Sequence, residues 1–339
     1  MNLDLKISVV ITVYNRREFI NDAIKSVINQ TVNLSSYEII IISNFPINIE
    51  SSKDERKITV VVMDGTVGQF LYKGICVAKY DIITFLEDDD LFLPDKFKHI
   101  LEIFSNNQNL SYYHNNFHFV NKQNKLINYY RLNESESKLK SNFKLFTNTK
   151  DLRYLKKILK VSGDFNLSCI TIKKSLLEKY LGLLKEIKSN PDAFFFWTSL
   201  ISESELFIEG TCLTNYRIHK ANVSSQKDPK AKANEMRKES YTYDIILNYI
   251  KHNNIRFYSY QSVINTMYLF KYEFEMIALM FDNYKRLDLI RSAIKIIKLG
   301  SKITNTLKKR ILIFSLFGLI SQSLLIRLYY QINSLLNER

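Results

Sequence analysis

Four short runs of apolar residues, rich in valine and isoleucine, most constrain what this chain can fold into. They cover residues 6–13, 37–42, 58–63 and 82–86. A segment with apolar residues at helical spacing, from Phe19 to Ile28, follows the first run, and a similar segment from Val67 to Ala78 precedes the last. Runs that are apolar on both faces and are separated by helices predict a parallel sheet covered on both sides.

The loops that follow these four runs are predicted to lie close together. They contain Tyr14, Ser43 and Asn44, Asp64, and the acidic segment 87–90. In open α/β sheets, ligands bind beyond the carboxyl ends of the strands. We therefore predict a nucleotide site at this edge of the sheet.

The acidic segment places four carboxylates, Glu87 to Asp90, directly after a buried strand. Such an arrangement is repulsive unless a cation or ordered hydrogen bonds compensate the charge. Mg²⁺ and Mn²⁺ prefer oxygen ligands and often use one or two carboxylates together with substrate phosphates. A solvated acidic turn ahead of a helix near Pro94 is the alternative, but the position at a strand end favours a cation site.

Three segments together resemble family 2 glycosyltransferases. They are residues 8–16 (SVVITVYNR), residues 26–31 (SVINQT) and residues 85–90 (FLEDDD) followed by Pro94. The resemblance is strong over residues 6–100 and weaker over residues 160–225. It implies the GT-A fold, an α/β fold with a Rossmann-like, mostly parallel sheet flanked by helices, which here precedes a helical C-terminal region.

The resemblance also implies how the donor is bound. Thr12 and Tyr14 would line the nucleotide base, and Tyr14 would offer a stacking face. Asp88 would contact the ribose and Asp89 the metal, with Glu87 as a further metal ligand. Relatives often carry an Asp pair after the second strand, whereas this chain has Ser43 and Asn44.

We predict that Asn44 and Asp64 complete the nucleotide-sugar site. The Ala-Arg-Asn of many relatives is also absent, because residues 70–72 read Phe-Leu-Tyr. Lys73 is therefore a candidate phosphate ligand.

Residues 190–197 (NPDAFFFW) place one carboxylate, Asp192, ahead of an aromatic helix. In the resemblance, Asp192 matches the second acid of a Glu-Asp pair, which acts as the catalytic base, while the first acid is missing. The local sequence fits equally well a helix-capping or first-turn aspartate that the helix dipole stabilises. One residue can have both roles.

Residues 216–224 (YRIHKANVS) resemble the Tyr-Arg-x-His-x-x-Asn-x-Ser segment that often follows the catalytic region in this family. His219 could bind the diphosphate or complete the metal shell, and Arg217 could offset phosphate charge. The segment 162–166 (SGDFN) is a weaker candidate for lining the acceptor pocket.

The formal charge of +14 is unevenly distributed along the chain. Residues 1–130 carry 13 Lys and Arg against 15 Asp and Glu, and the remainder carries 35 against 19. This surplus suits nucleic acid, an anionic membrane or a phosphorylated acceptor.

The basic cluster 308–310 precedes the apolar segment 311–326, which is shorter than the roughly 20 residues of a membrane span. We expect a helix on the membrane surface, or alternatively one packed on the protein or in a dimer interface.

No signal peptide is recognisable at the start of the sequence, so we expect a cytoplasmic protein that contacts the inner face of the membrane peripherally. The three cysteines lack the spacing of a zinc site or a redox motif. They are expected to be buried thiols.

These observations predict a GT-A domain over residues 1–225 and a helical region with a basic tail over residues 226–339. Residues 1–100 would bind the nucleotide sugar and residues 101–225 the acceptor. The expected activity is metal-dependent, inverting glycosyl transfer of the hexosyl type to a glycan or lipid-linked acceptor during polysaccharide synthesis. Mg²⁺ or Mn²⁺ would be the cofactor and Asp192 the base.

Two other functions are alternatives to this one. A nucleotide-sugar-binding protein without turnover would fit Ser43, Asn44 and the missing acid before Asp192. A basic nucleic-acid-binding protein predicts a basic stripe with exposed aromatic residues. It fits poorly, because the most organised part of the sequence is net acidic.

Overall fold

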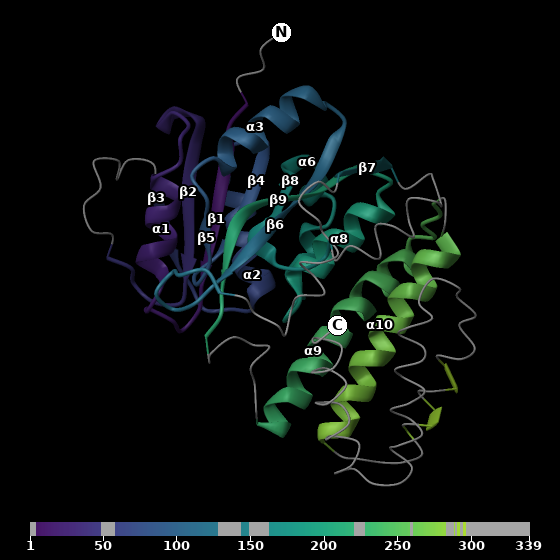
Figure 1. The fold of residues 1–339 in the computed structure, drawn as a ribbon. Coiled ribbons are helices and arrows are strands. Elements are labelled where there is room, and N and C mark those ends of the chain that lie inside the picture. Colours follow the sequence, from purple (N-terminus) through teal and green to yellow (C-terminus); the bar gives the residue numbers. More distant parts are fainter. Residues whose placement is uncertain are drawn as a thin grey trace. The chain divides into compact units, whose positions relative to one another are not determined.

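The computed structural model describes residues 5–48, 58–127, 144–148, 163–219, 228–257, 260–282, 288, 290–291 and 294–295. They belong to two compact units. The first contains all the described strands and helices α1 to α8, and the second contains residues 188–190, His219 and helices α9 and α10 (Figure 1).

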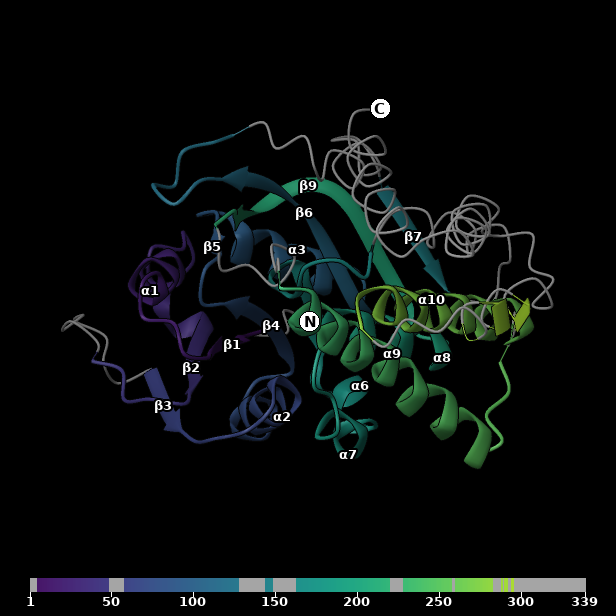
Figure 2. The same ribbon diagram turned by 90° about the horizontal axis from the view of Figure 1, so that it is seen from below.

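The first unit is built on a nine-stranded sheet with the order β3-β2-β1-β4-β8-β6-β9-β5, in which β7 also pairs with β9. The first four of these strands are parallel: β1 (Ile7–Val13), β2 (Tyr37–Ser43), β3 (Ile58–Val62) and β4 (Ile82–Glu87). Figure 2 shows β3 at the outer edge, with β2 and β1 between it and β4. The predicted parallel sheet is confirmed.

The other half of the sheet is mixed. Its strands are β5 (Leu91–Phe92), β6 (Leu110–Val120), β7 (Lys144–Asn148), β8 (Ile170–Lys173) and β9 (Glu205–Arg217). β8 runs antiparallel to β4 and β6, whereas β6 and β9 are parallel. This arrangement brings the end of β9, which lies far from β4 in the sequence, alongside β5 and next to the acidic segment.

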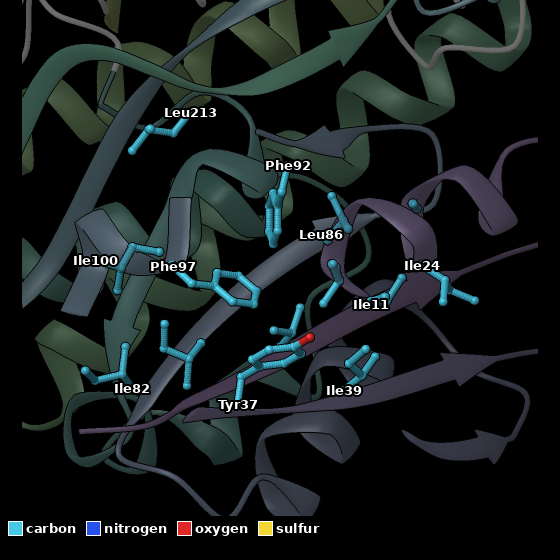
Figure 3. Close-up of a cluster of buried hydrophobic side chains, with 14 of the residues drawn as sticks. Ile11, Ile24, Tyr37, Ile39, Ile82, Leu86, Phe92, Phe97, Ile100 and Leu213 are labelled. Carbon is cyan, nitrogen blue, oxygen red and sulfur yellow. The ribbon is translucent and has the colours of Figure 1, made fainter. Parts of the chain in front are cut away.

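Helices cover both faces of the sheet. They are α1 (Ile20–Ile28), α2 (Val67–Val77), α3 (Lys96–Asn106), α6 (Lys174–Glu178), α7 (Leu181–Leu184) and α8 (Pro191–Ile201), with short 3₁₀ turns η1 (Leu34–Ser36) and η3 (Leu167–Cys169). Side chains of α1 and α3, such as Ile24 and Phe97, pack with Ile11 and Tyr37 on one face (Figure 3). On the other face Phe85 of β4 stacks on Phe195 of α8, with ring centroids 4.8 Å apart. Burial of these alternating strand residues fixes the positions of the strand ends.

The third apolar run differs from the prediction that both faces are covered. It forms β3, the terminal strand of the sheet path, and Val60 and Val62 are 36% and 52% exposed. A strand at the edge has one neighbour instead of two, so less of its surface is covered. The prediction of a strand at residues 58–63 is confirmed, and the prediction that both faces of this strand are covered is wrong.

Gly68, in the first turn of α2, lies against the chain that follows α7. Its N–H donates to the carbonyl of Ile187 at 3.1 Å. A Cβ atom at position 68 would overlap the carbonyl oxygens of Leu184 and Ile187. Glycine therefore permits a close contact between α2 and the chain after α7 that a side chain would prevent.

The second unit contains two long helices, α9 (Pro229–His252) and α10 (Tyr260–Phe281), which pack against each other. Asp228 caps α9 by accepting a hydrogen bond from the N–H of Ala231 at 2.6 Å. Lys271 of α10 pairs with Asp244 of α9 at 2.6 Å. The predicted helical pattern beyond residue 230 is confirmed as far as α10.

No helix among the described residues is long and apolar enough to cross a membrane. The basic tail at residues 308–330 lies outside those residues, as does the predicted domain boundary at residues 225 and 226. Both stay predictions.

Candidate active site

The loops after β1 and β2 meet through two asparagines. The side-chain oxygen of Asn44 accepts a hydrogen bond from the main-chain N–H of Asn15 at 2.9 Å, and the Asn44 amide donates to Asn15 Oδ1 at 2.6 Å. Asn15 has the left-handed conformation, with φ of 56°. This reciprocal pair joins the carboxyl ends of the two strands.

Tyr14 is the most exposed aromatic ring at this edge, with 58% of its surface accessible. One side of the ring packs edge-on against Phe70 of α2, with centroids 6.0 Å apart. Thr12 lies opposite Glu87 in the register of β1 and β4. Asp64, after β3, is exposed. The predicted donor-site residues of the first three strands therefore lie at the carboxyl edge, as expected.

Arg16 lies between two carboxylates of the acidic segment. Its Nε donates to Asp88 Oδ1 at 3.1 Å, and its Nη1 is 2.7 Å from Asp89 Oδ2. Both aspartates are buried, whereas a quarter of the Arg16 side chain is exposed. A cation from the loop after β1 thus compensates charge in the loop after β4.

Asp90 is fully buried and is held by hydrogen bonds from other elements. Its Oδ1 accepts from the main-chain N–H of Arg217 at 3.1 Å, and its Oδ2 accepts from the amide of Asn166 at 3.1 Å. Burial and the nearby Asp89 raise the pKa of Asp90 to about 7, although these hydrogen bonds and one from Ser168 oppose the rise. Burial also raises the pKa of Glu87 well above its usual range, with further contributions from Asp89 and Asp90.

Arg217, at the end of β9, is fully buried and makes hydrogen bonds to the acidic loop and to two neighbouring segments. Its Nε donates to the carbonyl of Asp89 at 2.7 Å and its Nη1 to the carbonyl of Lys122 at 2.8 Å. Its Nη2 pairs with Asp22 of α1 at 3.1 Å. The guanidinium also lies over the ring of Phe19, 4.4 Å from its centroid. Arg217 therefore places a positive charge next to the acidic loop, on its buried side.

A second buried cation, Lys96 in the first turn of α3, supports the same region. Its ammonium donates to the carbonyl of Ser168 at 2.6 Å and to the hydroxyl of Thr214 at 3.0 Å. Burial lowers its pKa to about 7, and the nearby Cys169 and Asp90 oppose this. The Ser168 hydroxyl in turn accepts from the N–H of Glu87 at 3.0 Å. Lys96 therefore holds η3 against the start of the acidic loop.

Asp192 lies in the first turn of α8, and both its carboxylate oxygens accept main-chain hydrogen bonds. Oδ2 accepts from Asn166 at 3.0 Å and Oδ1 from Ala193 at 3.1 Å. Burial raises the pKa of Asp192 to about 7, with a further contribution from Asp164, while the hydrogen bonds oppose the rise. A carboxyl group that titrates near neutral pH has the acid strength expected of a general base.

The carboxylate chemistry of this site suits Mg²⁺ or Mn²⁺. Asp88 and Asp89 offer hard oxygen atoms that already bind a cationic group, Arg16. Among the described residues, no group of three or more His, Cys, Asp or Glu side chains could hold a metal ion by itself. Mg²⁺ commonly takes one or two carboxylates and completes its shell with substrate phosphates and water. The residues therefore fit a cation that arrives with a diphosphate.

The structure brings most of the predicted site residues to one edge of the first unit. The residues of the acidic loop, Thr12, Tyr14 and Asn44 lie there, and Asp192 joins them through Asn166. Asp192 and Glu87 are near enough for the charge of Asp192 to contribute to the raised pKa of Glu87. His219 is buried in the second unit, so its predicted role as a metal ligand stays a prediction.

The sequence pattern assigned no role to Arg16 or Lys96, and Asn166 was expected only as part of the segment 162–166 that lines the acceptor pocket. Arg16 could have been identified, because a basic residue after β1 must lie near an acidic segment after the neighbouring parallel strand β4. Asn166 precedes Leu-Ser-Cys and caps η3, which is a local signal for a turn and carries no indication of its distant partners. Lys96 carried no such signal.

Comparison with known proteins identifies the family. Residues 8–180, more than half of the 339-residue chain, match the model of the family described as glycosyl transferase family 2. An uncharacterized glycosyltransferase of Rickettsia conorii is 33% identical over 135 residues, 37% of this chain and 21% of that protein. One of Rickettsia typhi is 22% identical over 232 residues, 65% of this chain and 66% of that protein. The matches thus span less than two thirds of either relative.

Solved structures are similar over nearly the whole chain. The crystal structure of Staphylococcus aureus TarS 1–349 has a TM-score of 0.59 at 11% identity, covering 98% of this chain and 89% of that one. The same protein in complex with UDP-GlcNAc has a TM-score of 0.52 at 13% identity, with coverage of 98% and 89%. At such low identity the likeness shows the fold, and it confirms the predicted GT-A architecture.

Proposed function

Because this chain belongs to glycosyl transferase family 2, we propose that it transfers a hexosyl group from a nucleotide-diphosphate sugar to a hydroxyl of a glycan or lipid-linked acceptor, with inversion at the sugar carbon. One observation carries the proposal. A buried acidic loop that already binds a cationic group lies within one hydrogen-bonded network with Asp192, whose pKa is about 7.

The donor would bind at the carboxyl edge of β1 to β4. Tyr14 supports this, since its exposed ring offers a face for a nucleotide base. The Asn15 and Asn44 amides can donate to and accept from the base edge beside it. Asp64 and Thr12 lie at the ends of the neighbouring strands. The complex of the similar TarS structure with UDP-GlcNAc makes a nucleotide sugar the natural first ligand to test.

Asp89, assisted by Glu87 and Asp88, would hold Mg²⁺ or Mn²⁺ together with the donor diphosphate. When bound, such a cation stabilises the negative charge of a departing diphosphate. His219 is proposed as a further ligand on the resemblance alone. Arg16 would leave Asp89 or move to the phosphates, because a guanidinium binds phosphate as readily as carboxylate.

Asp192 would accept the proton of the acceptor hydroxyl. Main-chain donors hold both of its oxygens, which limits the directions in which the carboxylate can turn. With a pKa of about 7, a large fraction is deprotonated at neutral pH while the group remains basic enough to accept a proton. A base on the acceptor side of the sugar carbon suits direct displacement, which inverts that carbon.

We further propose that the protein works at the cytoplasmic face of the membrane in polysaccharide synthesis. The basic surplus after residue 130 and the tail sequence at 308–330 support a peripheral contact with anionic lipid. This part of the proposal rests on the sequence.

The decisive experiment screens nucleotide sugars by thermal unfolding, with Mg²⁺, with Mn²⁺ and with excess EDTA. A donor that binds the folded protein raises the melting temperature by mass action. We expect one donor class to do so with a divalent cation, and to release its nucleoside diphosphate when an acceptor is added. Binding without any release would support a donor-binding protein without turnover, and no binding by any nucleotide sugar would overturn the proposal.

A further inference from the structure

Asn166 makes two hydrogen bonds that join the two parts of the candidate site, and a third that fixes its side chain. Its main-chain N–H donates to Asp192 Oδ2 at 3.0 Å, and its side-chain amide donates to Asp90 Oδ2 at 3.1 Å. Its side-chain oxygen accepts from the N–H of Ser168 at 2.7 Å, which caps η3. The residue is 3% exposed. It is therefore a buried junction between the acidic loop and α8.

Asparagine meets the requirements of this position better than other residues. The backbone has φ of 68°, in the left-handed region that asparagine and glycine tolerate best. The side chain must donate to Asp90 and accept from Ser168 at once, and an amide offers both groups on one short side chain. Glycine would keep the backbone but lose both side-chain bonds, and aspartate would lose the donor.

Asn166 connects two residues, Asp90 and Asp192, that lie far apart in the sequence. Asp90 follows β4, whereas Asp192 lies on α8, and their common partner belongs to neither element. Asn166 reaches Asp192 through the backbone, so the left-handed conformation itself sets the direction of that N–H. Because φ is the rotation about the N–Cα bond, it sets the angle between this N–H and the side chain held by Asp90, so a large change of φ would break one of the two bonds.

We propose that Asn166 is a positioning residue, which orients Asp192 through its main-chain N–H and fixes Asp90 through its side-chain amide. The orientation of Asp192 and the position of the acidic loop would then both depend on Asn166. This inference rests on the proposed function for its catalytic meaning, but the geometry can be tested without turnover. The hydrogen bond from Asn166 is also among the groups that lower the pKa of Asp192 against the effect of burial.

Two substitutions separate the two connections. Asn166→Gly keeps the left-handed backbone and the N–H to Asp192 but removes the amide from Asp90. Asn166→Ala removes the same amide and also disfavours the backbone conformation that directs the N–H. Asn254, exposed after α9 with φ of 48°, provides the matched control, and it is changed to glycine and to alanine in the same way.

The first measurement is the pKa of Asp192, read from its carboxyl ¹³C resonance in the full chain and assigned with Asp192→Asn. The titratable groups that face Asp192 among the described residues are Asp164, Glu87 and Tyr112, and all are unchanged in these variants. We expect the pKa of Asp192 to rise in Asn166→Ala and to stay near the parent value in Asn166→Gly. An unchanged pKa in Asn166→Ala, or an equal rise in both variants, would overturn the proposal whether or not the protein is a transferase.

The second measurement uses UDP-GlcNAc as the probe and follows UDP release against pH, together with donor affinity by thermal shift. Misplaced catalytic groups can lower rates by roughly 100-fold without weakening ground-state binding. We expect kcat to fall by about 10- to 100-fold in Asn166→Ala with donor affinity nearly unchanged, and the pH midpoint to rise with it. Parental kcat in both Asn166 variants would contradict the positioning role. If the parent itself releases no UDP from this probe, the ¹³C measurement alone decides the inference.

Discussion

Arg16 Nη1 lies 2.7 Å from Asp89 Oδ2, so the residue predicted to bind a divalent cation is paired with a cation of the protein's own chain. Arg16 also donates to Asp88, and both aspartates are buried. An arginine in this place lets the acidic loop fold before any metal or diphosphate arrives, because it compensates the repulsion between neighbouring carboxylates. A metal ion bound at Asp89, as proposed, would have to compete with Arg16 for that carboxylate.

The first prediction concerns this competition. Arg16→Ala should lower the free energy of unfolding by about 1–3 kcal/mol without divalent cations, because two buried carboxylates lose a charged hydrogen-bond donor. Mg²⁺ or Mn²⁺ should restore more stability to this variant than to the parent. Thermal unfolding with and without the cation measures both effects. Arg17→Ala is the control, since Arg17 lies over the ring of Phe45 and donates to the carbonyl of Pro46, away from the acidic loop. Equal responses of the parent and Arg16→Ala to the cation would contradict the competition.

The second prediction concerns metal dependence. Asp89→Ala should abolish metal-dependent binding of the nucleotide sugar, because the diphosphate then lacks the cation that compensates its charge. Asp81→Ala, at the opposite end of β4, should leave donor binding unchanged. Donor binding by thermal shift, and turnover with an acceptor, are the measurements. Full activity in excess EDTA would show that no such metal is needed.

The third prediction separates catalysis from helix stabilisation at Asp192. Asp192→Asn keeps the size of the side chain but cannot accept a proton, and loss of a general base lowers rates by roughly 10²- to 10⁴-fold. Donor affinity should stay near that of the parent. Asp228→Asn, at the cap of α9, is the control for a first-turn or capping effect alone. Near-parental turnover would leave Asp192 as a helix-stabilising residue and direct attention to Asp164.

The pH dependence of stability gives a fourth, independent prediction. The pKa of Asp192 is raised from 3.8 to about 7 in the folded protein. Between these values the folded state binds more protons than the unfolded state, so this group makes the free energy of unfolding fall as pH rises through that window. Asparagine does not titrate. The melting temperature of Asp192→Asn relative to the parent should therefore increase from about pH 5 to about pH 8, and a constant difference would refute the raised pKa.

The fifth prediction concerns Tyr14. Because its ring is largely exposed, Tyr14→Ala should weaken nucleotide-sugar binding while changing the melting temperature of the free protein little. Loss of one base-stacking ring weakens binding by about 1–3 kcal/mol. Tyr14→Phe, which keeps the ring, should bind nearly as the parent does. Tyr241→Ala, an exposed tyrosine of α9, is the control. Unchanged donor affinity in Tyr14→Ala would exclude stacking on this ring.

The parallel half of the fold could be predicted from the sequence because its signals are local. The apolar runs, the helices between them and the acidic segment all follow one another within the first hundred residues. The order of the strands was not predicted, because right-handed connections between parallel strands restrict the possible orders without selecting one. The exposure of β3 could not be predicted in this way, because an edge strand and a central strand of a parallel sheet can have the same apolar sequence.

The surroundings of Asp192 depend on contacts between segments far apart in the chain. Asp192 could be found from its place before an aromatic helix, and the segment 162–166 was a candidate for the site. The contact between Asn166 and Asp192 could not be predicted, since its donor is a main-chain N–H that any residue except proline carries. The buried Lys96 was missed for a related reason. The position of the Lys96 ammonium depends on hydrogen bonds to Ser168 and Thr214, which belong to η3 and β9 and lie far from Lys96 in the sequence.

The close backbone contact at Gly68 limits how this protein can be recombined with its relatives. The contact at this glycine is set by two backbones, one from α2 and one from the chain after α7, with no side chain between them to adjust. A chimaera that takes residues 1–100 from one relative and residues 101–225 from another would keep this contact only if both parents bring their main chains equally close at this point. If the proposed donor site is at the strand ends, its specificity is therefore better exchanged by replacing individual loops there than by exchanging halves.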